Sequence, residues 1–359
     1  HEIFICVSRA KILQNLNLWM NILSGKLVLQ KPEFYLYLWQ TFFLVVPVVS
    51  TTFASFGRMF ADLGRESLGW LLIDEAGQAV PQAAVGAIWR TKNTIVVGDP
   101  LQIEPVIGLD ETVIEQVRQH FKINAEWSLK TASVQSLADR VNQFGAYISN
   151  DLSKIWVGCP LRVHRRCINP MFKISNEIAY NGKMVFATKP EDKQVILGNS
   201  RWIDSQGKCS RGHWVDELWI EVKKLLREAA GENGDFPKVY LISPFRDIAR
   251  ELKKLVVKEK NEWLQNPRFS HKEVKSWAAK SIGTVHTFQG KEKEMVIFVL
   301  GVDEDSISSA QWAANKPNML NVAATRAKYG FYIVGNSRVW SNLRNFEMAY
   351  RELKISEKR

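Results

Sequence analysis

Cysteine is scarce in this 359-residue chain, which carries four: Cys6, Cys159, Cys167 and Cys209. No two of them have the Cys-x-x-Cys spacing that is typical of zinc sites and redox motifs. Four cysteines in so long a chain also do not suggest a disulfide-stapled fold, and a reducing, cytoplasmic compartment fits them best. We interpret Cys159 and Cys167 as packing residues.

Long apolar segments are missing as well. The strongest candidate, Phe42 to Val49, is interrupted by Pro47 and is shorter than the ~20 residues that a helix needs to cross a bilayer. The stretch from His1 to Val7 lacks the basic start and the small-residue cleavage site of a signal peptide. We therefore predict no membrane partner, and we interpret Phe42 to Ser50 as a buried strand.

Acidic charge is in deficit. The chain has 48 Lys and Arg against 37 Asp and Glu, a formal net charge of +11. This balance favours a polyanionic partner without identifying one. Between Arg246 and Lys280, ten basic residues face five acidic ones. That stretch has two interpretations, the solvated face of a helix pair or a surface that meets phosphates.

A short apolar run ends in paired carboxylates in LLIDEAGQ, residues 71–78. A buried parallel strand delivers acids to a nucleotide site in this way. The first acid, Asp74, suits Mg²⁺ held beside phosphates, and the second, Glu75, suits the orientation of an attacking water. The alternative is a strand that simply runs into an acidic loop. A second apolar run, TIVVGDPLQ at residues 94–102, ends in Gly-Asp-Pro and a glutamine.

With these two motifs the chain resembles superfamily 1 helicases of the type that includes the nonsense-mediated-decay helicase and its bacterial relatives. The first run is similar to motif II of that family and the second to motif III. Three later stretches follow in the family's order: LRVHRR (161–166) resembles its Tyr-Arg-Met-His motif, GTVHTFQGKE (283–292) motif V, and NVAATRAK (321–328) motif VI. The resemblance covers roughly residues 47 to 336.

The resemblance implies an ATP-dependent helicase or translocase that moves 5′-to-3′ along a single strand, with ATP and Mg²⁺ between two domains. Asp74 would hold the Mg²⁺, Glu75 would polarise the attacking water and Gln102 would touch the γ-phosphate. Arg162 and Arg326 would reach the phosphates from the second domain, because the planar guanidinium binds phosphate bidentately and is always charged. The surface or ion-paired arginine is the alternative for each when it is considered alone.

Further nucleotide contacts are implied at six positions: Gln78, Gly98, Asp99, Gln289, Gly290 and Glu292. Gln78 is a weaker candidate for the γ-phosphate sensor. Gly290 permits close approach of the backbone, and Glu292 is placed to accept a hydrogen bond from a ribose hydroxyl.

Contacts to single-stranded nucleic acid, DNA or RNA, are implied at two strand ends and in motif V: Thr51, Thr52, Ser243, Pro244, Arg246 and Thr287. Hydroxyl and backbone N–H groups there would grip phosphates without reading sequence. For the two threonines a simple helix cap is the alternative. The sequence also departs from the family at Leu161, where an aromatic usually stacks on adenine, and at Glu104, where a proline is common.

The phosphate-binding loop Gly-x-x-x-x-Gly-Lys-Ser/Thr occurs nowhere in the chain. In the family it precedes motif II, so we expect this chain to be the C-terminal part of a longer motor whose upstream portion carries the loop. Alone, the chain should hydrolyse ATP poorly or not at all. Two alternatives stay open: a nucleic-acid-binding fragment without hydrolysis, and an ATPase that remodels protein–nucleic-acid complexes without unwinding.

Strands that alternate with helices predict an α/β fold, and the resemblance implies tandem RecA-like, doubly wound parallel-sheet domains, the first one incomplete. The expected division is a helical remnant at 1–40, a partial first domain at 41–151 and a second domain at 152–359. Expected strands are 45–51, 70–73, 94–97, 156–158, 239–242, 281–285, 295–300 and 331–334. Expected helices are 134–144, 165–178, 214–227 and 245–260.

Overall fold

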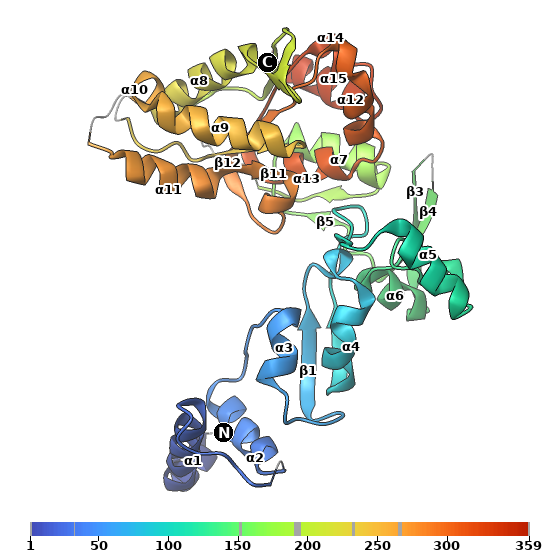
Figure 1. The fold of residues 1–359 in the computed structure, drawn as a ribbon, viewed down its shortest axis with the longest axis vertical. Coiled ribbons are helices and arrows are strands. Elements are labelled where there is room, and N and C mark those ends of the chain that lie inside the picture. The colour runs from blue at the N-terminus through green and yellow to red at the C-terminus, as the bar shows by residue number, and fades with distance from the viewer. Residues whose placement is uncertain are drawn as a thin grey trace. The chain divides into compact units, whose positions relative to one another are not determined.

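The structure is a computed structural model that describes residues 2–31, 33–150, 153–189, 195–231, 234–264 and 268–357. The chain divides into two compact units (Figure 1). Unit 1 comprises residues 1–99 and 104–138, and unit 2 comprises residues 100–103 and 139–359. None of the helices in the described part combines the length and the apolar character needed to cross a bilayer.

Unit 1 begins with the helices α1 (Glu2–Leu23) and α2 (Glu33–Val45), as expected for the first forty residues. The strand predicted at Phe42 to Ser50 is wrong, because α2 continues to Val45 and no strand follows before β1. The aromatic residues of α2 recur at helical spacing and face one cluster: the Trp39 ring lies 4.8 Å from Trp19 and 4.7 Å from Phe60. Pro47 disfavours helical backbone at the residue before it, which is consistent with the end of α2 at Val45.

The sheet of unit 1 has two parallel strands among the described residues, β1 (Leu68–Ile73) and β2 (Thr91–Val96), joined through α4 (Pro81–Trp89). Both strands were predicted. Apolar side chains on both remain open to solvent, with exposed fractions of 64% for Trp70, 71% for Leu72 and 44% for Ile95. The short helix α3 (Phe53–Met59) precedes the sheet, and α5 (Glu111–His120), η2 (Ala125–Trp127) and α6 (Val134–Val141) follow it.

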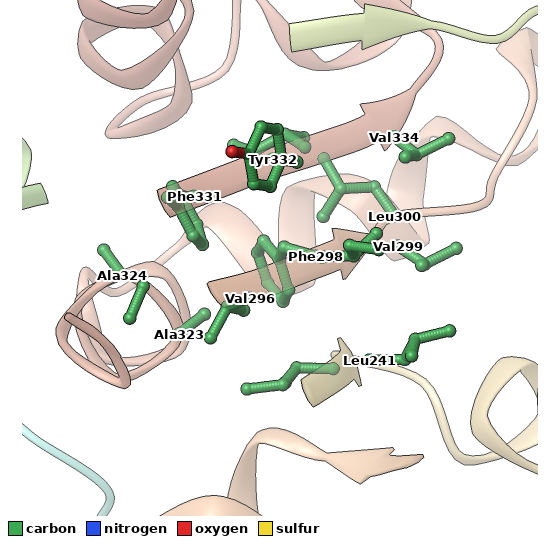
Figure 2. Packing of buried hydrophobic residues seen from close by; sticks show 14 of the residues in the cluster. Leu241, Val296, Phe298, Val299, Leu300, Ala323, Ala324, Phe331, Tyr332 and Val334 are labelled. Atoms are coloured by element: carbon green, nitrogen blue, oxygen red, sulfur yellow. The ribbon is translucent and has the colours of Figure 1, made fainter. Parts of the chain in front are cut away.

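Unit 2 is built on a five-stranded sheet in the order β11-β10-β12-β13-β7, and every pairing is parallel. The predicted α/β class with a parallel sheet is thereby confirmed. Its central strands bury apolar side chains on both faces, as the continuous apolar runs indicated (Figure 2). The strands are β7 (Arg201–Asp204), β10 (Val239–Ser243), β11 (Ile282–Thr284), β12 (Lys293–Val299) and β13 (Ala327–Gly335).

Helices cover this sheet, and among them α9 packs on α11 while α7 packs on α13 and α15 (Figure 1). The helices and helical turns of unit 2 are α7 (Met171–Tyr180), α8 (Glu217–Ala230), α9 (Arg246–Lys258), α10 (Lys260–Trp263), α11 (His271–Ser281), η3 (Val285–Phe288), η4 (Glu304–Ser306), α12 (Ile307–Ala314), α13 (Asn318–Thr325), α14 (Ser337–Trp340) and α15 (Phe346–Glu357).

Three short strand pairs complete unit 2 and shift some predicted boundaries. The strand predicted at 156–158 is β4 (Ser153–Gly158), which pairs antiparallel with β3 (Gly145–Asn150). Residues 163–164 form β5 (Val163–His164), paired with β6 (Val185–Phe186), so the helix expected at 165–178 starts only at Met171. The helix expected from 214 starts at Glu217, because β9 (Trp214–Val215) pairs with β8 (Cys209–Arg211).

Candidate nucleotide and nucleic-acid sites

The turn after β1 carries both carboxylates of motif II. Glu75 has a φ of 53°, a left-handed backbone that residues other than glycine rarely adopt. An Asp74 Oδ1 atom accepts a hydrogen bond from the Glu75 backbone N–H at 2.9 Å, and the Gln78 side-chain amide donates to Glu75 Oε2 at 3.2 Å. Backbone conformations of this kind cost of the order of 1 kcal/mol and cluster at functional sites. Gln78 therefore holds Glu75 in addition to any contact of its own with nucleotide.

The turn after β2 packs backbone to backbone against this first turn. The Ala76 N–H donates to the Val97 carbonyl at 3.0 Å. A Cβ atom on Gly98 would lie 2.8 Å from the Gly77 nitrogen, and one on Gly77 would lie 2.9 Å from the Asp99 carbonyl oxygen. Glycine is required at both positions because no side chain fits there. The structure thus brings together five of the predicted nucleotide residues of unit 1: Asp74, Glu75, Gln78, Gly98 and Asp99.

Asp74 fits the way in which proteins hold Mg²⁺ beside nucleotides. Its carboxylate is exposed at the end of β1. Within the described ranges, no three His, Cys, Asp or Glu side chains are grouped so that they could hold a metal ion. Mg²⁺ does not need such a cage, since it usually keeps several waters and binds one or two carboxylates together with substrate phosphates.

The glutamine of motif III lies in the other unit. Residues 100–103 belong to unit 2, where Leu101 is buried in the main apolar core. The Asn321 side-chain amide donates to the Leu101 carbonyl at 3.1 Å, and that of Asn318 donates to the Gln102 carbonyl. Sequence reasoning assigned Gln102 to the first domain and missed both asparagines. Asn321 stands at the start of motif VI, but its burial and its bond to Leu101 are visible only in the structure.

The two predicted arginines of unit 2 differ in burial. Arg326 is fully buried, and its guanidinium donates to the carbonyls of Val322 at 3.2 Å and Lys291 at 3.1 Å and to the Thr325 hydroxyl at 3.2 Å. Arg162 is exposed and donates to the Lys183 carbonyl at 2.6 Å. In this structure Arg326 is bound within unit 2, whereas Arg162 faces solvent.

Motif V places Glu292 among cations. Glu292 forms ion pairs with Lys328 and with Arg166, the latter at 3.5 Å. Gly290 precedes it with a φ of 73°, which favours glycine. Burial raises the pKa of the nearby Tyr240, and the Glu292 charge adds to that effect. The predicted residues Gln289, Gly290 and Glu292 are therefore adjacent on one turn, with a carboxylate that is already paired.

The predicted nucleic-acid residues divide between the two units. In unit 1, Thr52 occupies the N-cap position of α3, but its side chain makes no capping hydrogen bond, and Thr51 precedes it. In unit 2, Ser243 is fully buried and its hydroxyl accepts from the Phe245 N–H at 3.2 Å. Thr287 is exposed, with its hydroxyl 3.3 Å from that of Thr284.

Two grooves on unit 2 collect the remaining predicted contacts. The smaller, of about 760 Å³, is lined by Pro244, Phe245, Arg246, Arg250, Thr284, His286 and Trp312, together with His213, Asp247, Ser308 and Ser309. The larger, of about 1210 Å³, shares Arg246, Arg250 and Thr284 with it and adds the cations Arg211, Lys253, Lys254, Lys258 and Lys275. Burial, and then the charge of Arg246, lower the pKa of the His286 ring. The two grooves thus share three residues, and the cations of their lining outnumber its acids Asp216, Asp247 and Glu251.

Comparison with known proteins adds family information. Two family profiles, both described as "AAA domain", match residues 153–338 and residues 33–108. The uncharacterized ATP-dependent helicase MG140 of Mycoplasma genitalium is 24% identical over 264 residues, which cover 72% of this chain and 22% of the relative. The DNA replication ATP-dependent helicase/nuclease DNA2 of Gallus gallus is 21% identical over 303 residues, covering 80% of this chain and 25% of the relative.

A third relative matches a shorter segment more closely. The regulator of nonsense transcripts 1 homolog of Drosophila melanogaster is 39% identical over 82 residues, 21% of this chain and 6% of its own length. The chain therefore spans about a quarter or less of the length of these three relatives. Among solved structures, the arterivirus nonstructural protein 10 helicase with DNA aligns over 74% of this chain and 39% of its own, with 13% identity and a TM-score of 0.33.

Proposed function

The chain belongs to the superfamily 1 helicase family that includes the nonsense-mediated-decay helicase, and we propose that it supplies the C-terminal motor portion of an ATP-dependent nucleic-acid helicase or translocase. The observation that carries the proposal is the paired turn of unit 1. There Glu75 stands in a left-handed backbone beside Asp74, and Gly98 packs directly on the same turn. Movement in the 5′-to-3′ direction is part of the proposal and comes from the resemblance.

In the proposed chemistry, ATP binds with Mg²⁺ and is contacted by acids of unit 1 and arginines of unit 2. The Mg²⁺ supplies charge neutralisation at the phosphates, and Asp74 holds it. Glu75, fixed by Gln78, takes a hydrogen bond from the attacking water and orients it. Arg162, which is exposed, stabilises the negative charge that develops on the phosphates. Arg326 stabilises the same charge after phosphate oxygens replace the carbonyl oxygens as acceptors of its hydrogen bonds.

We propose that the phosphate-binding loop comes from the upstream part of the same motor. The chain contains no such loop. The open apolar side chains of β1 and β2, among them Trp70, Leu72 and Ile95, would be covered by helices that pack on the faces of a completed sheet. A pair of parallel strands with this much exposed apolar surface is otherwise unusual, since parallel sheets are normally covered on both faces.

Replacement of the proposed catalytic acid in the full-length motor tests the ATPase function. Glu75→Gln keeps the shape and hydrogen bonding but loses the charge that polarises water, so nucleic-acid-stimulated ATP hydrolysis should fall by roughly 10³-fold or more while nucleotide binding persists. Glu126→Gln, an exposed acid of η2 outside the motifs, is the matched control and should retain hydrolysis. If Glu75→Gln kept most of its turnover, Glu75 would not be the catalytic acid.

The charged grooves favour nucleic-acid binding by the chain itself, which is the second function, with or without hydrolysis. Arg246 and Arg250 line both grooves. Phosphate contacts give a binding constant whose logarithm falls with log salt by about 0.7 per contacted phosphate on a single strand. Fluorescence anisotropy of a labelled oligonucleotide should therefore give a slope of about −3 for a handful of contacts. A flat salt response, or a strong preference for one sequence, would contradict this function.

Remodelling without unwinding is distinguished by its product. In the full-length motor, helicase action releases one strand of a tailed duplex, whereas remodelling releases a bound protein from a single strand and leaves the duplex intact. DNA and RNA versions of both substrates, each with a 5′ or a 3′ tail, would assign the strand chemistry and the direction.

A further inference from the structure

Trp312 is an exposed aromatic residue that sequence analysis did not select. It lies on α12, lines the smaller groove and has 60% of its surface exposed. Single exposed apolar residues are common and need no functional explanation. Trp312 differs from such residues because the cations Arg246 and Arg250 line the same groove.

The groove beside Trp312 has a rigid aromatic floor. Phe245 is buried, and the centre of its ring lies 6.2 Å from that of Trp312. The His213 ring stacks on the Phe245 ring, with 4.1 Å between the ring centres and an interplanar angle of 10°. Asp247 fixes His213 through the backbone N–H at 2.8 Å and through Nδ1 at 2.9 Å, and Ser309 lies 3.1 Å from its Nε2. His213 and the Phe245 ring on which it stacks are therefore held in one geometry beside Trp312.

Positive charge lines the same groove on the α9 side. Arg246 and Arg250 are both exposed and are four residues apart on α9, so their side chains share one face of that helix. The same two arginines line the larger groove with its lysines. An exposed aromatic ring beside a track of cations is the combination by which proteins bind single strands without sequence preference, because every base has a π-face.

We propose that Trp312 stacks on one base of a single-stranded nucleic acid whose phosphates contact Arg246 and Arg250. This inference rests on the nucleic-acid binding proposed above and adds the residue that contacts a base. Trp312 thereby favours single strands, since the bases of a duplex are already stacked on one another.

The test measures binding of Trp312→Ala and Trp312→Phe to two oligonucleotides of equal length, one with bases and one whose central residues are abasic. Trp312→Ala should weaken binding of the base-bearing strand by roughly 5- to 150-fold, the range expected for loss of one base–aromatic stack. Trp312→Phe should retain most of the affinity. Ile307→Ala, an exposed apolar residue of the same helix that does not line the groove, is the matched control and should bind as the parent does.

The abasic strand separates stacking from other effects. Its affinity should be the same for the parent and for Trp312→Ala, and the salt slope on the base-bearing strand should also be unchanged, since no cation is removed. Equal binding of the base-bearing strand by parent and Trp312→Ala would overturn the proposal, and so would an equal loss on both strands. A parent chain that binds neither strand would instead refute nucleic-acid binding itself. Unchanged circular dichroism would show that the variants are folded.

Discussion

The main sheet of unit 1 and the main sheet of unit 2 are both parallel, but they differ in how completely they are buried. The two-stranded sheet of unit 1 leaves Trp70 and Leu72 mostly exposed, whereas the central strands of unit 2, for example at Phe298 and Phe331, are fully buried (Figure 2). Yet the turn that carries the paired carboxylates Asp74 and Glu75 follows a strand of the less buried sheet. The geometry of that turn is fixed locally by glycine contacts and short-range hydrogen bonds.

The two units also differ in the size of the apolar core that stabilises them. Unit 2 has a large apolar core that stabilises its sheet directly. The sheet of unit 1 has a small core around Ile73, Ala76, Ala84 and Val134, and its outer apolar side chains are exposed. We therefore expect unit 2 to carry most of the stability of this chain.

Truncation of one apolar side chain in each of these sheets gives the largest expected difference in stability. Phe298→Ala removes a fully buried ring that faces Phe331 and Phe346, so it should lower the free energy of unfolding by about 3–5 kcal/mol. Leu72→Ala in unit 1 should change it by less than about 0.5 kcal/mol, since the side chain is mostly exposed. Denaturant titration followed by circular dichroism measures both. A large loss for Leu72→Ala would show that β1 is already covered in solution.

Replacement of the buried Arg326 and of the exposed Arg162 should give a smaller difference in the free energy of unfolding. Arg326→Ala leaves the Lys291 carbonyl and the Thr325 hydroxyl without the guanidinium as donor and creates a cavity, so a loss of roughly 2–4 kcal/mol is expected. Arg162→Ala should cost less than about 0.5 kcal/mol, because Arg162 is exposed.

Both substitutions should depress ATP hydrolysis in the full-length motor if both arginines serve the phosphates. Arg326→Lys is the control that keeps the charge but not the planar fork of donors. Normal hydrolysis with low stability for Arg326→Ala would assign that residue a structural role alone. A large loss of strand affinity for Arg326→Ala with normal hydrolysis would place it in the nucleic-acid groove.

Much of the parallel sheet could be predicted from the sequence because its strands are continuous apolar runs. The run around Phe42 misled because its aromatic residues follow helical spacing, and Trp39 and Phe42 pack on Trp19 rather than into a sheet. Tertiary contacts determine which unit residues 100–103 join. Nothing in residues 100–103 indicates that they join the second unit, which depends on amide hydrogen bonds from α13.

The candidate site was also predicted unevenly. The residues of the motif II turn were found because acids after a buried strand have a local pattern. No local sequence pattern indicates that Arg326 is buried or that Trp312 is exposed. The residues around a single arginine or tryptophan in a helix are the same whether its side chain is buried or exposed. Motif resemblance therefore identified positions, and only the fold gave their surroundings.

Acid titration gives the smallest expected effect, and it belongs to unit 2. Burial, and then the charge of Arg166, hold the pKa of His164 below its usual range, while the Cys167 thiol, whose pKa burial raises to about 12, stays neutral. The ring also accepts the Cys167 N–H at Nε2, at 3.1 Å, and protonation there would break this bond. Above the ordinary histidine pKa of about 6.5, the native and unfolded chains both carry a neutral His164, so stability does not change through this group.

Below pH 6.5, His164 binds a proton in the unfolded chain but stays neutral in the native chain until the pH reaches its lowered native pKa. The free energy of unfolding should therefore fall as the pH drops from 7 to 5. His286, whose pKa is also lowered, should add to the fall. Urea titrations at several pH values measure it, and His164→Gln, which cannot titrate, should show a shallower fall than the parent. An equal fall in His164→Gln would assign the acid sensitivity to other groups. A rise in stability below pH 6.5 would mean that the native ring is charged and that its place beside Arg166 and Cys167 is wrong.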